Sequence, residues 1–334
     1  MAVTIRDIAE KAGVSNAMVS RALNHSGPVA PEKKQRILEI AGALGYTPNP
    51  AAVSLRRLKT HVVGVFFSAI NRGTSPYVLH KVMIGVFDVL GGRYNVVLQA
   101  IDQYIPGSLS SGFYDGILVM SQWDGDLEFL EEAHARKIPM VALSRQLPID
   151  IPYVITDEQG GMAMAMDHLL SQGHRRIGII EGPQNLQATI YRHAGWRAAA
   201  RQHGINPGSF PIETGNFRYR TGKAAALKLL TEHPDLTALL CFNDEMALGA
   251  IDAAAYLGRK TPEDISVTGY DNWDFTGHSD AQLTTVERNT IQIASEGARM
   301  LLQYMEEGTR PNPVFLENRL VVRGSVRNLL SGRT

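Results

Sequence analysis

The side chains best suited to a chemical task in this chain are lysines and arginines gathered near its start. Residues 1–61 contain nine Lys or Arg and four Asp or Glu, so this segment carries a net charge of +5. The whole chain has 33 residues of each sign, so residues 62–334 carry −5. Cationic side chains bind nucleic-acid phosphates, and a basic segment on an acidic body is expected where only that segment contacts DNA.

The sequence around these basic residues predicts two short helices joined by a tight turn. Thr4 and Asp7 form a capping-box pattern, which predicts a helix that starts near Ile5. Gly13 permits a sharp turn, and Ser15 can cap a second helix. The residues expected to face inward are Ile8, Ala9, Ala12, Val19, Ala22 and Leu23. This pattern predicts a helix-turn-helix, whose second helix lies in the major groove. The alternative is an ordinary helical hairpin at the start of an enzyme, and the local charge favours DNA binding.

A third helix and a possible hinge follow. The helix is expected from Pro31 to about Leu44, with Gly45 at its end. Residues 46–50 (YTPNP) break the helical pattern, and residues 58–61 indicate a linker. Between them, the stretch AAVSLRR is long enough for two helical turns and too short to be a stable helix alone.

From residue 62 onward, apolar runs typical of buried strands alternate with helical patterns. The predicted strands are 62–67, 96–99, 116–120, 140–143, 153–156, 177–181, 239–242, 265–269 and 319–323. The predicted helices are 79–90, 127–137, 160–172, 190–203, 221–232, 246–257 and 290–307. This alternation predicts an α/β fold, in which the all-α headpiece precedes two doubly wound parallel-sheet subdomains with a cleft between them. Ligands of such sheets bind beyond the carboxyl ends of the strands.

Composition and missing motifs exclude several classes of protein. No apolar run approaches the roughly 18 residues of a membrane helix, and the first residues lack the apolar region of a signal peptide, so we expect a cytoplasmic protein without a membrane partner. The single Cys241 forms no intrachain disulfide and lies in a run (ALLCF) typical of a buried strand. The ten histidines show no metal-binding spacing, so no metal site is expected. Motifs of nucleotide-binding enzymes, serine hydrolases and zinc proteases are missing, so we expect no enzyme.

Motifs across nearly the whole chain resemble the lactose-repressor family of bacterial transcription regulators. In the first part they are IAEKAGVS at 8–15, VSRALN at 19–24 and LGYTPN at 44–49. In the body they are GHRRIG at 173–178, RHAGW at 192–196, NDEMALG at 243–249, ISVTGYD at 265–271, LTTV at 283–286 and LVVRGS at 320–325.

This resemblance implies a ligand-responsive repressor that binds palindromic operator DNA as a homodimer. The body would be similar to a periplasmic binding protein and hold a small-molecule effector, with a sugar favoured, and no cofactor. The implied domains are a headpiece (1–48), a hinge helix and linker (49–61), an N-terminal core subdomain (62–157 with 288–318) and a C-terminal core subdomain (158–287 with 319–334). The chain would cross between the subdomains near 156–158, 286–289 and 318–321. No heptad run follows residue 323, so a dimer is expected rather than a tetramer.

The resemblance also assigns DNA contacts. Asn16, Ala17 and Arg21 would face base edges, because Arg donates two bonds to guanine, Asn pairs with adenine and a small Ala admits a thymine methyl. The other contacts of the headpiece are Thr4, Ser15, Ser20 and Asn24, with the serines placed on phosphates. A structural or phosphate-binding role remains the alternative for Arg21.

In the hinge, Leu55 would wedge between base steps in the minor groove, with Arg56 beside it. The hinge helix would form only with a dimer partner and operator present, which makes it an order–disorder switch. A mobile linker is the alternative.

For the effector, the family places an arginine, an amide and a carboxylate in the cleft. Here these are Arg192, Asn243 and Asp271, a set that suits a polyhydroxylated ligand. Aromatic walls would come from Phe217 and Trp273, and a weaker contact from Tyr77. Core packing is the alternative for Phe217 and Trp273. Asp244 is interpreted as a helix cap.

The chain departs from the family pattern at four places. Met18 stands where a phosphate-binding Thr is usual, and Ala30 where Ser or Thr caps the third helix. Residues 102–113 are too short and too rich in Gly and Ser for the helix usual there. Ser144 replaces an Asp common before Arg145, which puts a ligand contact from that loop in doubt.

An enzyme and a sugar-binding protein are the alternatives to a DNA-binding regulator. An α/β enzyme would need one of the missing motifs, and a sugar-binding protein without a DNA role would not need the basic headpiece. The effector could be a plant-derived saccharide, a sugar acid or a nucleobase, and the sequence does not distinguish induction from corepression.

Overall fold

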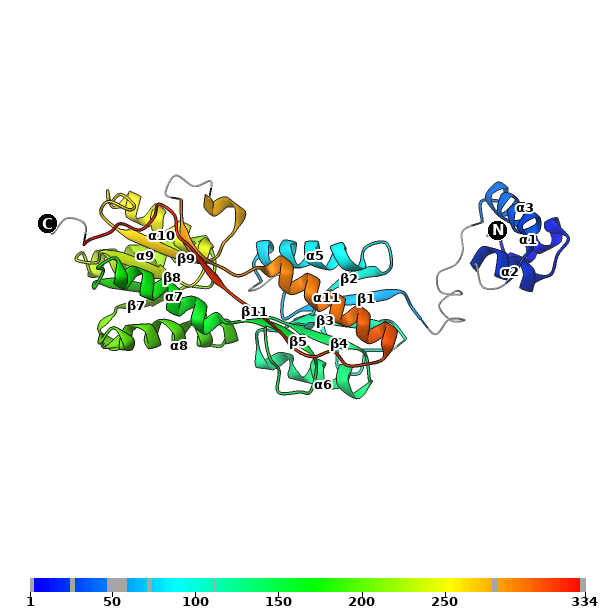
Figure 1. The fold of residues 1–334 in the computed structure, drawn as a ribbon, viewed down its shortest axis with the longest axis horizontal. Coiled ribbons are helices and arrows are strands. Elements are labelled where there is room, and N and C mark those ends of the chain that lie inside the picture. Colours follow the sequence, from blue (N-terminus) through cyan, green and yellow to red (C-terminus); the bar gives the residue numbers. More distant parts are fainter. Residues whose placement is uncertain are drawn as a thin grey trace. The chain divides into compact units, whose positions relative to one another are not determined.

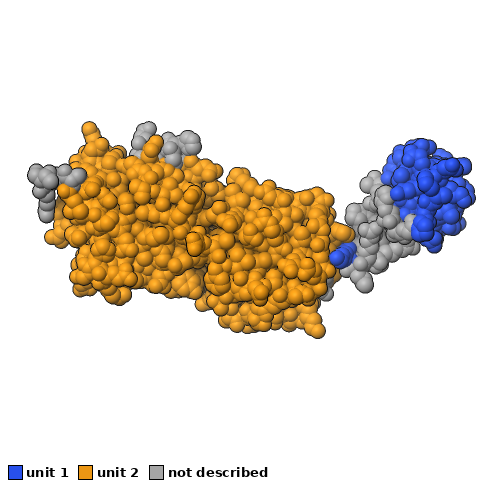
Figure 2. Space-filling model, viewed as in Figure 1, with its two compact units in different colours: residues 1–60 blue, residues 61–334 orange. Residues whose placement is uncertain are grey.

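The computed structural model describes residues 3–24, 28–46, 59–70, 74–110, 112–277 and 282–330, with the backbone alone at residues 24, 275 and 277. The chain forms two compact units, residues 1–60 and residues 61–334 (Figure 2). Each unit has a hydrophobic core of its own.

The described part of the first unit is a bundle of three helices, α1 (Ile5–Ala12), α2 (Asn16–Asn24) and α3 (Pro31–Ala43). The Asp7 carboxylate accepts hydrogen bonds from the Thr4 N–H and hydroxyl, both at 2.8 Å. Gly13 turns the chain with a φ of 68°, and the Ser15 hydroxyl accepts the Met18 N–H at 3.2 Å. The buried core is Ile8, Ala9, Ala12, Val19, Ala22, Ile37 and Ala41. The predicted helix-turn-helix and third helix are confirmed.

In the part of the second unit that the structure describes, two six-stranded sheets are present (Figure 1). The first has the order β11-β5-β4-β3-β1-β2, and all its strand pairs are parallel. Its strands are β1 (Val62–Phe67), β2 (Asn95–Ala100), β3 (Gly116–Met120), β4 (Met140–Leu143), β5 (Tyr153–Thr156) and β11 (Val314–Leu316). Helices α5 (Pro76–Leu90) and α11 (Thr290–Glu307) pack together on one face, and α6 (Leu127–Ala135) covers the other (Figure 1).

The second sheet has the order β12-β10-β9-β8-β6-β7, and only β12 runs antiparallel among its described pairs. Its strands are β6 (Ile177–Glu181), β7 (Ile212–Thr214), β8 (Ala238–Cys241), β9 (Ser266–Asp271), β10 (Thr284–Glu287) and β12 (Arg319–Val321). The helices that cover it pack in pairs, α7 (Glu158–Ser171) with α8 (Gln187–Gln202) and α9 (Tyr219–Glu232) with α10 (Asp244–Tyr256). The predicted α/β fold is confirmed.

The chain passes between the two sheets three times. The first passage joins β5 to α7 at Asp157, the second joins β10 to α11 at residues 288–289, and the third joins β11 to β12 at residues 317–318. These passages place the carboxyl ends of β1 and β3 opposite those of β8 and β9, where a cleft ligand is expected.

Three strands were not predicted, and the reason is local. Strands β7 and β11 have three residues each and lie at sheet edges, and β10 is a short run with two threonines. The two three-residue strands are too short for a periodic signal, and the threonines of β10 interrupt the apolar run expected of a buried strand. Within 102–110 and 112–113 the structure contains no α-helix, as the sequence predicts. No helix among the described residues is long and apolar enough to span a bilayer.

Candidate functional site

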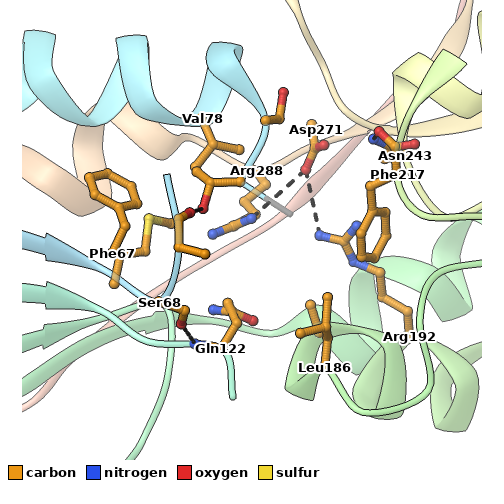
Figure 3. A pocket seen from close by; sticks show the side chains of 15 residues that line it. Phe67, Ser68, Val78, Gln122, Leu186, Arg192, Phe217, Asn243, Asp271 and Arg288 are labelled. Carbon is orange, nitrogen blue, oxygen red and sulfur yellow. Dashed lines mark hydrogen bonds and ion pairs between the residues drawn. The ribbon is translucent and has the colours of Figure 1, made fainter. Parts of the chain in front are cut away.

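A cavity of about 140 Å³ lies between the two sheets (Figure 3). The described lining comes from both subdomains and from the second passage: Phe67, Ser68, Ala69, Thr74, Ser75, Val78, Met120, Gln122, Leu186, Ala188, Arg192, Phe217, Asn243, Asp271 and Arg288. Four of the six predicted ligand residues are therefore together in one cavity.

Arg192 is the most constrained of these residues. Its side chain lies in α8 and is 2% exposed. Its Nε donates to Glu158 Oε2 at 2.7 Å, Nη1 donates to the Phe242 carbonyl, and Nη2 lies 3.5 Å from Asp271 Oδ1. Burial alone would lower the pKa of this guanidinium, but Glu158 and Asp271 raise it above its usual value. Arg192 is thus a fixed cation at the cavity wall.

Asp271 ends β9 and faces two arginines. Its Oδ1 lies 3.5 Å from Arg192 Nη2 and 3.9 Å from Arg288 Nη1, so Figure 3 shows it between the two guanidinium groups. Burial raises the pKa of the Asp271 carboxyl to about 6, although both arginines oppose the shift. The Oδ1 atom is buried and has no hydrogen-bond donor among the described residues. It is free to accept a hydrogen bond from a ligand hydroxyl.

Asn243 lines the cavity but also holds the local backbone. Its Oδ1 accepts the Met246 N–H at 3.0 Å, which caps α10, and its Nδ2 donates to the Phe217 carbonyl at 2.9 Å. Phe217 has a left-handed φ of 64°, so this bond fixes a strained residue. The interpretation of Asp244 as the cap is wrong. Asp244 is instead buried, where it accepts the Trp273 N–H at 2.8 Å.

The structure places Tyr77 and Trp273 outside the lining of the cavity. Trp273 is 2% exposed and Tyr77 is 45% exposed, and their ring centroids lie 5.6 Å apart. The Trp273 backbone N–H is held by Asp244, and the indole lies against Tyr77 and Lys81 of α5, between the two subdomains, rather than in a hydrophobic core. Phe217 lines the cavity beside Arg192 (Figure 3) and also packs against the core of its subdomain.

Gln122 and Arg288 line the cavity but were not predicted from the sequence. Gln122 follows β3, and its Oε1 is buried without a hydrogen-bond donor among the described residues. Arg288 lies in the second passage, where its Nη2 donates to the Ser144 hydroxyl at 2.6 Å. The rule that ligands bind beyond carboxyl ends of strands could have found Gln122. No local signal marks Arg288, because β10 itself was not predicted.

Among the described residues, four of the seven non-glycine residues with a left-handed φ line this cavity or contact or adjoin a residue that does. Ser144, Phe217, Asp271 and Asn272 all have left-handed φ values, of 64°, 64°, 109° and 53°. Such conformations cost free energy and are concentrated at functional sites. Ser144 does not line the cavity. Its hydroxyl is used to hold Arg288, so its contribution is to the position of that arginine.

On the headpiece, Asn16, Ala17 and Arg21 are all exposed on α2. Their spacing places them within one side of the helix, where they can reach the same groove. Ser20 is only 8% exposed, because it lies on the core side of α2, so the structure does not favour its predicted phosphate contact. Met18 packs against the core and cannot replace a phosphate-binding hydroxyl.

The other predicted DNA contacts are either used in helix caps or lie outside the described side chains. Thr4 and Ser15 are exposed, and their hydroxyls bond within the helix caps of α1 and α2. The side chain of Asn24 and the hinge residues Leu55 and Arg56 lie outside the described residues.

Comparisons with known proteins agree with this architecture. Residues 4–49 match the family model "Bacterial regulatory proteins, lacI family", and residues 166–326 match "Periplasmic binding protein-like domain". The chain is 36% identical to the probable HTH-type transcriptional repressor ExuR of Bacillus subtilis, over 98% of this chain and 99% of that protein.

Two solved structures extend the likeness. The complex of the transcriptional regulator CelR with cellobiose has a TM-score of 0.71 at 30% identity, over 97% of this chain and 99% of that one. The Lac repressor dimer bound to operator and the anti-inducer ONPF has a TM-score of 0.86 at 25% identity, over 98% of this chain and 100% of that one.

Proposed function

Because the chain belongs to the lactose-repressor family of bacterial regulatory proteins, we propose that it represses transcription as a dimer whose operator affinity changes when a small sugar fills the cleft. The observation that carries this proposal is a cavity between the two sheets, with Arg192 and Asp271 in its lining, in a chain that also has a helix-turn-helix. The family consists of DNA-binding regulators, not enzymes. A sugar-binding role without DNA leaves the match of residues 4–49 unexplained.

Operator binding is assigned to α2 and the hinge. Arg21 and Asn16 are exposed side chains that can form bidentate bonds with guanine and adenine, and each good pair is worth roughly 1–3 kcal/mol of discrimination. Leu55 and Arg56 stay predicted minor-groove contacts. A regulator that acts on bacterial DNA works in the cytoplasm, so we place this one there.

Dimerisation is supported by exposed apolar side chains on one side of the second unit. Phe87 on α5 is 51% exposed, Tyr256 at the end of α10 is 75% exposed, and Tyr219 and Leu257 are also exposed. Figure 1 shows α5, α9 and α10 along the same side of the unit. Exposed apolar patches mark protein–protein interfaces, and a palindromic operator needs two headpieces.

The effector would act through contacts that span the cleft. The Ser75 hydroxyl donates to Glu245 at 2.5 Å, Arg218 donates to the Thr74 carbonyl at 2.8 Å, and the Gln187 N–H donates to the Gln122 carbonyl at 3.2 Å. Each bond joins one subdomain to the other. A ligand shifts the protein between open and closed states only if it binds them with different affinity, and these contacts exist only when the cleft is closed.

A gel shift with the full-length protein tests the proposal. The DNA is the region upstream of its own coding sequence, and the assay is repeated with a panel of sugars. We expect a shifted complex that competes against excess non-specific DNA and responds to at least one sugar. A protein that binds no fragment above its non-specific affinity is not an operator-binding repressor.

A further inference from the structure

We propose that the effector is an acidic sugar whose carboxylate binds between Arg192 and Arg288, an inference that rests on the proposed effector role of the cleft. Both arginines line the cavity and both are buried, at 2% and 7% exposure. They come from separate parts of the chain, α8 and the second passage between the sheets.

The two guanidinium groups converge without closing on an acceptor. Nη2 of Arg192 lies 3.5 Å and Nη1 of Arg288 lies 3.9 Å from the same atom, Asp271 Oδ1. Hydrogen bonds between N–H donors and oxygen are formed at 2.7–3.2 Å, so neither separation is a hydrogen bond to Asp271. An oxygen atom placed between the guanidinium groups would accept from both.

Other parts of the two arginines are held by the protein. Arg192 donates to Glu158 and to the Phe242 carbonyl, and Arg288 donates to the Ser144 hydroxyl. The Arg288 Nε lies 3.1 Å from Glu158 Oε1 in an ion pair, without a hydrogen bond among the described residues. These contacts hold both side chains on the side away from the cavity. The edges that face the cavity therefore stay in place for a ligand, and a planar carboxylate with two oxygens matches two such edges.

The charge of the cavity wall favours an anion. Among the described residues that line the cavity, the ionisable groups are Arg192, Arg288 and Asp271, which are two cations and one acid. Glu158 neutralises the arginines from behind and is not part of the lining. The full cluster of four groups is neutral, so a monoanionic carboxylate is accommodated at lower cost than a phosphate dianion.

The same wall requires hydroxyl groups on the ligand. Asp271 Oδ1 and Gln122 Oε1 are buried acceptors with no donor among the described residues, and both residues line the cavity. A plain carboxylic acid would leave these acceptors unpaired, which costs free energy. A sugar acid provides both the anion and the hydroxyl donors. Its carboxylate would bind the two arginines, and its hydroxyls would donate to Asp271 and Gln122. The Phe217 ring can pack against the sugar face.

Matched pairs of sugars test this directly. Isothermal titration with the full-length protein compares hexuronates and hexonates with the neutral hexoses and alditols that differ only at the carboxylate, and glucose 6-phosphate is a third class. We expect at least one acid to bind about 10- to 100-fold tighter than its neutral counterpart, because a charge-assisted hydrogen bond adds roughly 1.5–3 kcal/mol.

The variant Arg288→Gln keeps a polar side chain of similar reach and removes the second guanidinium. It should lose the preference for the acid over its neutral counterpart. Arg93→Gln, an exposed arginine paired with Glu306 on the surface, should keep it. If Arg288→Gln is unstable, the comparison of acid with neutral sugar on the unaltered protein still decides the matter.

Three results would overturn the proposal: a neutral sugar or the phosphate that binds as tightly as every acid, no binding by any acid, or an unchanged preference in Arg288→Gln. Tight binding of a neutral sugar would exclude the proposed recognition of a carboxylate, but it would not contradict the proposed repressor function. Loss of the repressor role would appear separately, as a failure of the gel shift.

Discussion

Glu158 and Arg288 form a buried ion pair beside the cavity, with Oε1 and Nε 3.1 Å apart. Each lies at a passage between the two sheets, Glu158 directly after the first and Arg288 within the second. At the third passage, Asn318 donates to the Asp157 carbonyl at 2.7 Å and to the Tyr270 hydroxyl at 3.0 Å. The residues that link the two subdomains are therefore in contact with those that line the cavity.

We expect Glu158→Gln to destabilise the second unit by about 3–5 kcal/mol, because it leaves two buried arginines without their shared carboxylate. The pKa of Glu158 supports this role, since burial would raise it and Arg192 and Arg288 hold it below its usual value. Urea unfolding followed by tryptophan fluorescence measures the change, because Trp123, Trp196 and Trp273 all lie in this unit. Glu296→Gln, a partly exposed member of an i,i+3 pair, should cost less than about 0.5 kcal/mol. Equal effects of both variants would contradict the shared-carboxylate role.

Arg21→Ala should weaken operator binding by about 10- to 100-fold, since a bidentate contact with guanine is worth roughly 1–3 kcal/mol. Fluorescence anisotropy with operator and scrambled DNA measures the loss. The loss should be much smaller on scrambled DNA, and effector affinity should not change, because Arg21 lies in the other unit. An equal loss on both DNA sequences would instead support the phosphate-contact alternative.

Arg192→Ala should abolish the effector response and leave operator binding in place, because it removes the central donor of the cavity. The measurement is a gel shift across effector concentrations. Truncation also leaves Glu158 unpaired, so thermal unfolding must first show that the variant is folded at the assay temperature. Arg192→Lys keeps the charge without the planar fork and should respond weakly. A normal response from both variants would mean that the ligand does not bind at Arg192.

Acid should destabilise the protein through His174. This side chain is 1% exposed, where Nδ1 lies 2.9 Å from the Thr237 hydroxyl oxygen and Nε2 lies 3.1 Å from the Arg327 carbonyl oxygen. Burial lowers the pKa of His174 to about 4 from an ordinary value of 6.5. The unfolded chain therefore binds more protons between these values, so the free energy of unfolding falls as pH falls from about 6.5 to 4.

The expected loss through His174 is about 2 kcal/mol. Urea unfolding at pH 7, 5.5 and 4.5 measures it, and the difference between the wild-type chain and His174→Gln isolates this residue from other titrating groups. His203→Gln, a partly exposed histidine paired with Asp167, is the matched control. Parallel pH profiles of the wild type and His174→Gln would show that the buried neutral histidine does not contribute.

Much of the fold was predictable because its signals are local. Thr4, Gly13 and Ser15 determine the helix ends of the headpiece through bonds to residues a few positions away. The central strands β1, β3, β4, β6 and β8 are buried on both faces, so they are apolar runs such as VVGVFF in β1. Edge strands β7 and β11 have no such signal, because they are short and their pattern depends on the neighbouring strand.

The site was only partly predictable, because its chemistry depends on segments that meet in three dimensions. Arg192, Phe217, Asn243 and Asp271 could be named from the family resemblance, and all four line the cavity. The sequence also suggested Trp273, but its indole packs against Tyr77 and Lys81 outside the cavity lining.

From its sequence alone, this protein was determined to have a basic helix-turn-helix and two α/β subdomains, since short-range bonds and apolar periodicity specify helices and strands. Only the tertiary structure decided that Arg288 joins Arg192 and Asp271 around one cavity, and that Gln122 completes it from the other sheet. The physical reason is that three passages of the chain bring distant segments together, and the packing of whole subdomains selects which polar groups meet there.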